Sequence, residues 1–97
     1  MAAADISMKN IAQVEQYSKY LESTSNQINE IFTKLKKKTD DIGQNWSDSQ
    51  FQQFRQMFDD VIMKQATGIS ETLVKLSIYT KKQCEFNRAA QNHKLNL

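Results

Sequence analysis

The sequence predicts an all-α protein in which two long amphipathic helices fold into an antiparallel hairpin. Three observations lead to this fold class. The chain of 97 residues contains no Pro and only two Gly, so few positions interrupt a helix. Apolar residues recur at helical rather than strand spacing in both halves. A short segment that includes Gly43 and Trp46 separates the two halves near the middle. We therefore expect one domain, residues 1–97, divided into a helix at about 7–42, a turn at about 43–47, a helix at about 48–90 and a frayed tail at 91–97.

The first helix is predicted from an apolar residue at every seventh position. The members of this stripe are Val14, Leu21, Ile28, Leu35 and Ile42. A seven-residue repeat makes a nearly axial stripe, as in coiled-coil packing. Asp5 or Ser7 is expected to cap the start of this helix.

The turn combines a stop signal with a start signal. Gly43 is expected to end the first helix in the left-handed conformation, which a side chain would disfavour. Ser47 and Gln50 have the spacing of a capping box, and Asp48 favours the positive end of a helix dipole. The second helix should therefore begin at Ser47 or Asp48.

The second helix carries an apolar stripe with steps of three and four residues. Its members are Phe51, Phe54, Phe58, Val61, Ile62, Ile69, Leu73, Leu76, Tyr79 and Phe86. Gly68, in the middle of this helix, is expected to allow a neighbouring helix to approach closely, or to kink the helix slightly.

A hairpin folded at the predicted turn brings together residues whose numbers sum to about 90. This register predicts apolar contacts between Leu35 and Phe54 or Phe58, Ile28 and Ile62, Leu21 and Ile69, and Val14 and Leu76.

The apolar surface of the second helix is wider than one neighbouring helix can cover. Phe51, Phe54, Phe58, Ile62 and Ile69 are therefore predicted to form a packing or partner-binding face, with Phe54 and Phe58 in the core. The excess surface favours association of two hairpins into a four-helix bundle, as a homodimer or as a heterodimer with a similar helical hairpin.

Trp46 has two possible roles. Its ring either covers the open end of the hairpin by packing on Ile42 and Phe51, or stays exposed and anchors a partner.

Other functional classes lack support. The net charge is only +2, and the basic residues from Lys34 to Lys38 fan around the helix beside Asp40 and Asp41, so we expect no nucleic-acid binding. Cys84 and His93 are too far apart on one helix to form a metal pair. We expect no catalytic residues, no enzyme activity, no metal and no cofactor. No apolar run is long enough for stable membrane insertion, and the N-terminus lacks the pattern of a cleavable signal peptide.

The residues around the turn resemble the WXG family, the small ESAT-like proteins exported by type VII secretion systems. The resemblance is carried by Trp46, Ser47 and Asp48 after Ile42, by Phe51 and Phe54, and upstream by Ile11, Ala12 and Tyr17. Asp48 stands where the family has Gly. Tyr79 and Gln83 have the spacing of the family's export signal, but Gln83 replaces its acidic residue.

The resemblance implies a non-enzymatic interaction module that is a secreted substrate, co-effector or targeting helper of a type VII-like system. A larger secreted effector and the secretion machinery would be further partners. The protein would reside in the bacterial cytoplasm and be secreted without a cleavable signal peptide. The alternative is a cytoplasmic structural or adaptor hairpin unrelated to secretion.

Overall fold

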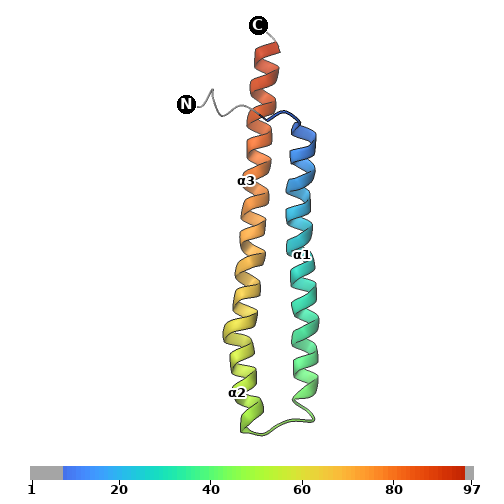
Figure 1. Cartoon of the computed structure of the whole chain (residues 1–97), viewed down its shortest axis with the longest axis vertical. Coiled ribbons are helices and arrows are strands. Elements are labelled where there is room, and N and C mark those ends of the chain that lie inside the picture. The colour runs from blue at the N-terminus through green and yellow to red at the C-terminus, as the bar shows by residue number, and fades with distance from the viewer. Residues whose placement is uncertain (1–7, 96–97) are drawn as a thin grey trace.

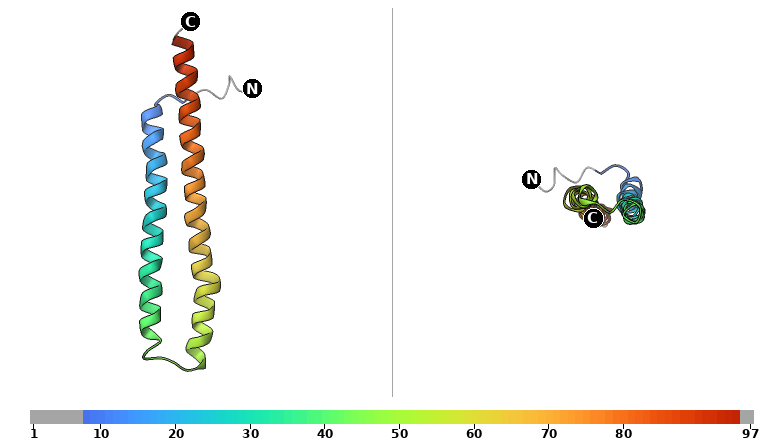
Figure 2. Two further views of the ribbon diagram at one scale, coloured as in Figure 1. Left: turned by 180° about the vertical axis from the view of Figure 1, so that it is seen from behind. Right: turned by 90° about the horizontal axis from the view of Figure 1, so that it is seen from below.

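The computed structural model describes residues 8–95, with side chains to residue 92. Two long helical rods lie antiparallel and form an extended hairpin measuring 73 × 22 × 13 Å (Figure 1). Seen along its axis, the molecule is a single layer of two rods side by side (Figure 2). The predicted all-α antiparallel hairpin is confirmed.

The first rod is helix α1 (Ile11–Ile42). It begins later than the predicted start near residue 7, because the side chain of Asn10 accepts a hydrogen bond of 3.0 Å from the amide of Gln13. This bond satisfies one of the amides left free at a helix start. The predicted caps, Asp5 and Ser7, lie outside the described residues.

The turn after α1 needs Gly43 for space rather than for conformation. Gly43 has φ −61° and ψ −19°, so the predicted left-handed stop is wrong. A Cβ on Gly43 would lie 2.9 Å from Cε2 of Phe51. The chain leaves the helix through hydrogen bonds of 2.9 Å from the amides of Asn45 and Trp46 to the carbonyl of Ile42.

Helix α2 (Ser49–Met57) is capped by Asp48. The Asp48 carboxylate accepts hydrogen bonds from the amides of Gln50 at 3.0 Å and Phe51 at 3.1 Å. The predicted capping box of Ser47 and Gln50 is therefore wrong. A carboxylate forms stronger bonds to free amides than a hydroxyl does and is favoured by the helix dipole, so Asp48 takes the amides that Ser47 would have used.

The second rod continues through a π-helical segment, η2 (Phe58–Met63), into α3 (Lys64–Leu95). Helix α3 runs to Leu95, into the segment 91–97 that was predicted to fray, and residues such as Ala89, Ala90 and Lys94 favour helix strongly. The end of α3 extends beyond the start of α1 (Figure 1). The wider π turn changes the angular spacing of the side chains between α2 and α3.

The seam between α1 and α3 consists largely of small residues. The Ser25 and Ser70 hydroxyls lie 2.6 Å apart, and Ser25 also donates to the Ser70 carbonyl at 2.9 Å. Seven residues away, the Ser77 hydroxyl donates to the Ser18 carbonyl at 2.7 Å. All four serines are at most 4% exposed. Because serine is small, the two backbones approach closely enough for a side-chain hydroxyl to donate to a backbone carbonyl of the opposite helix.

This seam overturns the predicted register. The bonded serine pairs have residue numbers that sum to 95 rather than about 90. The predicted register would place Leu21 against Ile69 and Ile28 against Ile62, and such bulky pairs would hold the backbones apart. The observed register instead satisfies the buried hydroxyls, which would be costly to bury unbonded.

The new register leaves large apolar side chains outside the seam. Ile69 is 54% exposed and Leu76 is 47% exposed, so neither forms the core contact predicted for it. Phe58 is buried as predicted, but Phe54 is 47% exposed and is not core. A Cβ on Gly68 would meet nothing within 4 Å, so the predicted close helix approach at Gly68 does not occur within the hairpin.

Replacing Ser25 with Leu should lower the free energy of unfolding by about 1–3 kcal/mol, because a larger side chain forces the closely packed helices apart. Chemical denaturation followed by circular dichroism measures this change. Ser23→Leu is the matched control. Ser23 is exposed on the same helix, and its substitution should change stability by no more than about 0.5 kcal/mol. Equal effects of the two substitutions would contradict the role assigned to the seam.

Candidate partner-binding face

One side of the hairpin carries its interhelical ion pairs. Glu15 pairs with Arg88, and Glu22 pairs with Lys81 at 3.1 Å. Near the turn, Arg55 bridges Asp40 and, at 3.2 Å, Asp59. These partially exposed pairs contribute little stability each. Their importance lies in marking this side of the molecule as a charged, hydrated surface, which we call the charged side.

The opposite side is mainly apolar. Helical spacing from the seam residues Ser25 and Ser70 places apolar residues of α1 and α3 on this side, away from the ion pairs. Trp46 and Phe54 belong to the same side because they line one hollow with residues of α1. We define the apolar face as Ile31, Leu35, Ile42, Trp46, Phe54, Ile62, Ile69, Leu73 and Leu76. All of these residues except Leu73 are exposed by 38% or more. Exposure of so many large apolar side chains on one side is unusual for a monomer.

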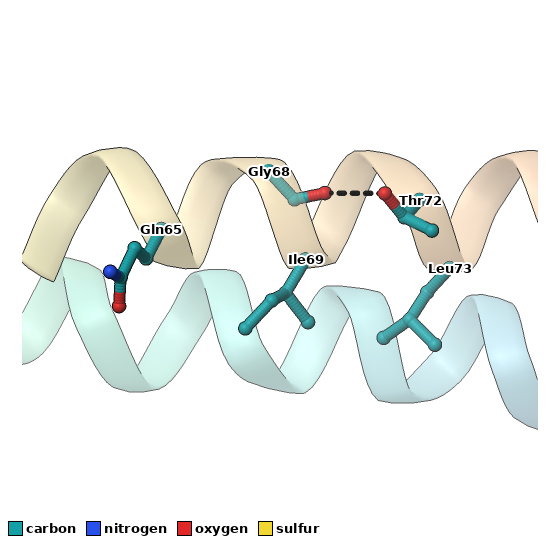
Figure 3. Close-up of a pocket in the computed structure, with 5 residues that line it drawn as sticks. All are labelled: Gln65, Gly68, Ile69, Thr72 and Leu73. Atoms are coloured by element: carbon teal, nitrogen blue, oxygen red, sulfur yellow. Dashed lines mark hydrogen bonds between the residues drawn. The ribbon is translucent and has the colours of Figure 1, made fainter.

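Two shallow hollows shape this face. The first lies on α3 and is lined by Gln65, Gly68, Ile69, Thr72 and Leu73. Figure 3 shows Gln65, Ile69 and Leu73 projecting toward α1, while the Thr72 hydroxyl donates to the carbonyl of Gly68 at 2.8 Å. The absence of a side chain at Gly68 deepens this hollow, since nothing in the hairpin fills the space.

The second hollow, the turn-end hollow, lies where the chain reverses. Its lining consists of Leu35, Lys38, Thr39, Ile42, Trp46 and Phe54. It is the place where the turn motif predicted from sequence meets the apolar stripe of α1.

The aromatic residues of the turn form a continuous cluster. The ring centroid of Trp46 lies 5.3 Å from that of Phe51 and 5.8 Å from that of Phe54. Phe54 in turn stacks on Phe58 at 6.5 Å. Trp46 remains 38% exposed and lines the turn-end hollow. Trp46 therefore packs against its aromatic neighbours and still exposes part of its side chain. The packing role and the partner-anchoring role predicted for it are compatible. Of its neighbours in the motif, Asp48 caps α2 and Ser47 is exposed.

Tyr79 and Gln83 lie one turn apart on α3, far from the turn motif. The Tyr79 side chain is 63% exposed, and Gln83 is partly buried. The backbone carbonyl of Gln83 accepts a hydrogen bond of 2.8 Å from the amide side chain of Asn87. Tyr79 is thus available to a partner, whereas the side chain at position 83 lies nearer the seam.

The described residues offer little reactive chemistry. Burial raises the pKa of the Cys84 thiol, which keeps it protonated and weakly nucleophilic. No three His, Cys, Asp or Glu side chains among the described residues gather closely enough to hold a metal ion. The side chain of His93 lies outside the described residues. Within the described part of the chain, no helix is both long and apolar enough to span a bilayer.

Comparison with known families identifies the chain. Residues 8–83 match the WXG100 family, described as proteins of 100 residues with WXG. The chain belongs to the WXG100 family. Comparisons with curated proteins and with solved structures gave no match. As a WXG100 protein, the chain is a small, non-enzymatic helical hairpin associated with type VII secretion.

Sequence reasoning missed the α3 side of the seam. Ser70, Ser77 and Cys84 are each at most 4% exposed, yet none was predicted to be buried. Their seven-residue spacing, which mirrors that of Ile11, Ser18 and Ser25 on α1, was a usable signal. Large apolar residues such as Ile62, Ile69 and Leu76 have the same seven-residue spacing, so the spacing alone does not show which set forms the seam.

Trp46→Ala should lower the stability of the hairpin by about 1–2 kcal/mol, because it removes two aromatic contacts from a partly exposed ring. Thermal unfolding and partner binding are measured on the same variant. Trp46→Phe, which keeps an aromatic ring, is the control and should retain most of the stability. An unchanged melting temperature for Trp46→Ala would contradict the packing role.

Proposed function

We propose that this WXG100 protein is a docking module that buries its apolar face against a similar helical hairpin to form a four-helix bundle. The observation that carries the proposal is the exposure of large apolar side chains on both helices of one side, while the opposite side carries the ion pairs. A single layer of two helices has no other means of removing this face from water.

The two sides of the hairpin suit different environments. Burying the charged side would strip water from Glu15, Glu22 and their partners, at a cost that exposed ion pairs seldom recover. Burying Ile62, Ile69 and Leu76 costs no hydrogen bonds and removes apolar area from water. The direction of docking therefore follows from the unequal cost of dehydrating the two sides.

Ile69→Glu should abolish or strongly weaken association while leaving the hairpin folded, because position 69 is exposed in the hairpin and would become buried in the bundle. Light scattering is performed on the protein alone and mixed with any short helical-hairpin protein encoded beside it. Circular dichroism of the variant checks the fold.

Ile78→Glu is the matched control. Ile78 is also an isoleucine of α3 with similar exposure, 48%, but it lies toward the charged side, where Lys81 and Lys82 favour a carboxylate. This variant should associate like the unmodified protein. Loss of association in Ile78→Glu but not in Ile69→Glu would place the interface on the charged side and contradict the proposal.

In the cell, we propose that the bundle is a secreted substrate, co-effector or targeting helper of a type VII-like system. The family membership and the exposed Tyr79 support this role over an adaptor unrelated to secretion. A larger secreted effector and the secretion machinery are its expected further partners.

Export should appear as protein in the culture medium that is lost when the secretion ATPase is deleted. Gln83→Glu restores the acidic residue of the family's signal and should increase the exported fraction if Tyr79 and position 83 act together. Gln91→Glu, which adds the same charge elsewhere on α3, is the control. Protein that stays inside the cell regardless of the ATPase and of both substitutions would contradict export through its own signal.

A further inference from the structure

In the described part of the chain, the only charged residue that lines a hollow of the apolar face is positively charged. Among the residues that line the turn-end hollow, Lys38 alone is charged. The hollow on α3 is lined only by uncharged residues. The carboxylates of Glu15, Glu22 and Asp40 belong to ion pairs on the charged side. The lining of the two hollows therefore contains a cation and no anion.

The Lys38 ammonium is not used by the hairpin itself. Within residues 8–92, the ion pairs are formed by Arg55, Lys81 and Arg88, and none includes Lys38. Lys38 is exposed and lines the turn-end hollow together with the apolar residues Leu35, Ile42 and Trp46. A carboxylate brought to this place by a partner would meet the ammonium in a partly desolvated setting, where opposite charges attract more strongly than in water.

A second copy of the chain has no carboxylate in the lining of either hollow to offer Lys38. Stacking two apolar faces places the turn-end hollow of one copy against residues of the same kind in the other, which are apolar, amide or hydroxyl, or a second Lys38. Self-association thus dehydrates the lysine without an opposite charge, whereas an acidic partner compensates for that loss.

We propose that the partner of the apolar face is a different helical protein, whose apolar stripe is flanked by Asp or Glu at the position that meets Lys38, and not a second copy of this chain. This inference rests on the docking role proposed above and specifies the partner. Lys38 acts as a specificity residue. The apolar side chains supply the attraction common to all helical partners, and the ammonium selects among them by charge.

The test uses the full chain and two designed helical peptides as probes. The peptides share one Leu and Ile stripe and differ only in having Glu or Lys at the flanking positions. Trp46 is the only Trp of the chain and lines the same hollow as Lys38, so its emission reports binding there. The acidic peptide should bind about fivefold more tightly than the basic one at low salt, and the difference should shrink as salt is raised.

Lys38→Glu should reverse this preference, so that the basic peptide becomes the tighter ligand. Lys37→Glu is the matched control. It makes the same charge change one residue away, at an exposed position that does not line the hollow, and should keep the preference for the acidic peptide. Circular dichroism confirms that both variants remain helical.

Failure of the inference and failure of the docking role give different results. Equal binding of both peptides, unaffected by Lys38→Glu, would leave the docking role intact and overturn the inference. A dimer by light scattering that neither peptide displaces would also overturn it, because a second copy would then be the preferred occupant. A monomer that binds neither peptide would refute the docking role, and the inference with it.

Discussion

The close contact between α1 and α3 at a seam of small residues is the constraint on which the rest of the structure depends. Ser25 reaches both the hydroxyl and the carbonyl of Ser70, and Ser77 reaches the carbonyl of Ser18. No buried side-chain nitrogen or oxygen among the described residues lacks a hydrogen-bond partner. Because these bonds span the two backbones directly, they require a small helix separation and a single register.

That register decides where the bulky residues go. Once serines occupy the line of closest approach, Ile69 and Leu76 are displaced to one side of the hairpin and remain exposed. The hairpin therefore satisfies its polar seam and leaves much of its apolar surface for another molecule. A two-helix protein has little core of its own, and the docking role proposed for this WXG100 protein would bury the apolar surface that the hairpin leaves exposed.

Much of the fold could be predicted from the sequence, because it depends on local properties. The absence of Pro, the helical period and the break after Ile42 are sufficient for two antiparallel helices. Local signals failed where two candidates competed for the same group. Ser47 and Asp48 could each cap α2, and the carboxylate bonds the amides in the structure. Gly43 was correctly placed at the end of α1, but its role is to make room for Phe51.

The candidate site was predicted less completely. The sequence by itself determined the helices, the turn around Trp46 and the family to which the chain belongs, since each depends on residues close together in the chain. Only the tertiary structure decided the register, the burial of Ser70, Ser77 and Cys84, and the exposure of the apolar face beside Lys38. The reason is that a helical period shows only which residues share a stripe. Whether the serines or the isoleucines form the seam depends on how closely the two backbones can approach.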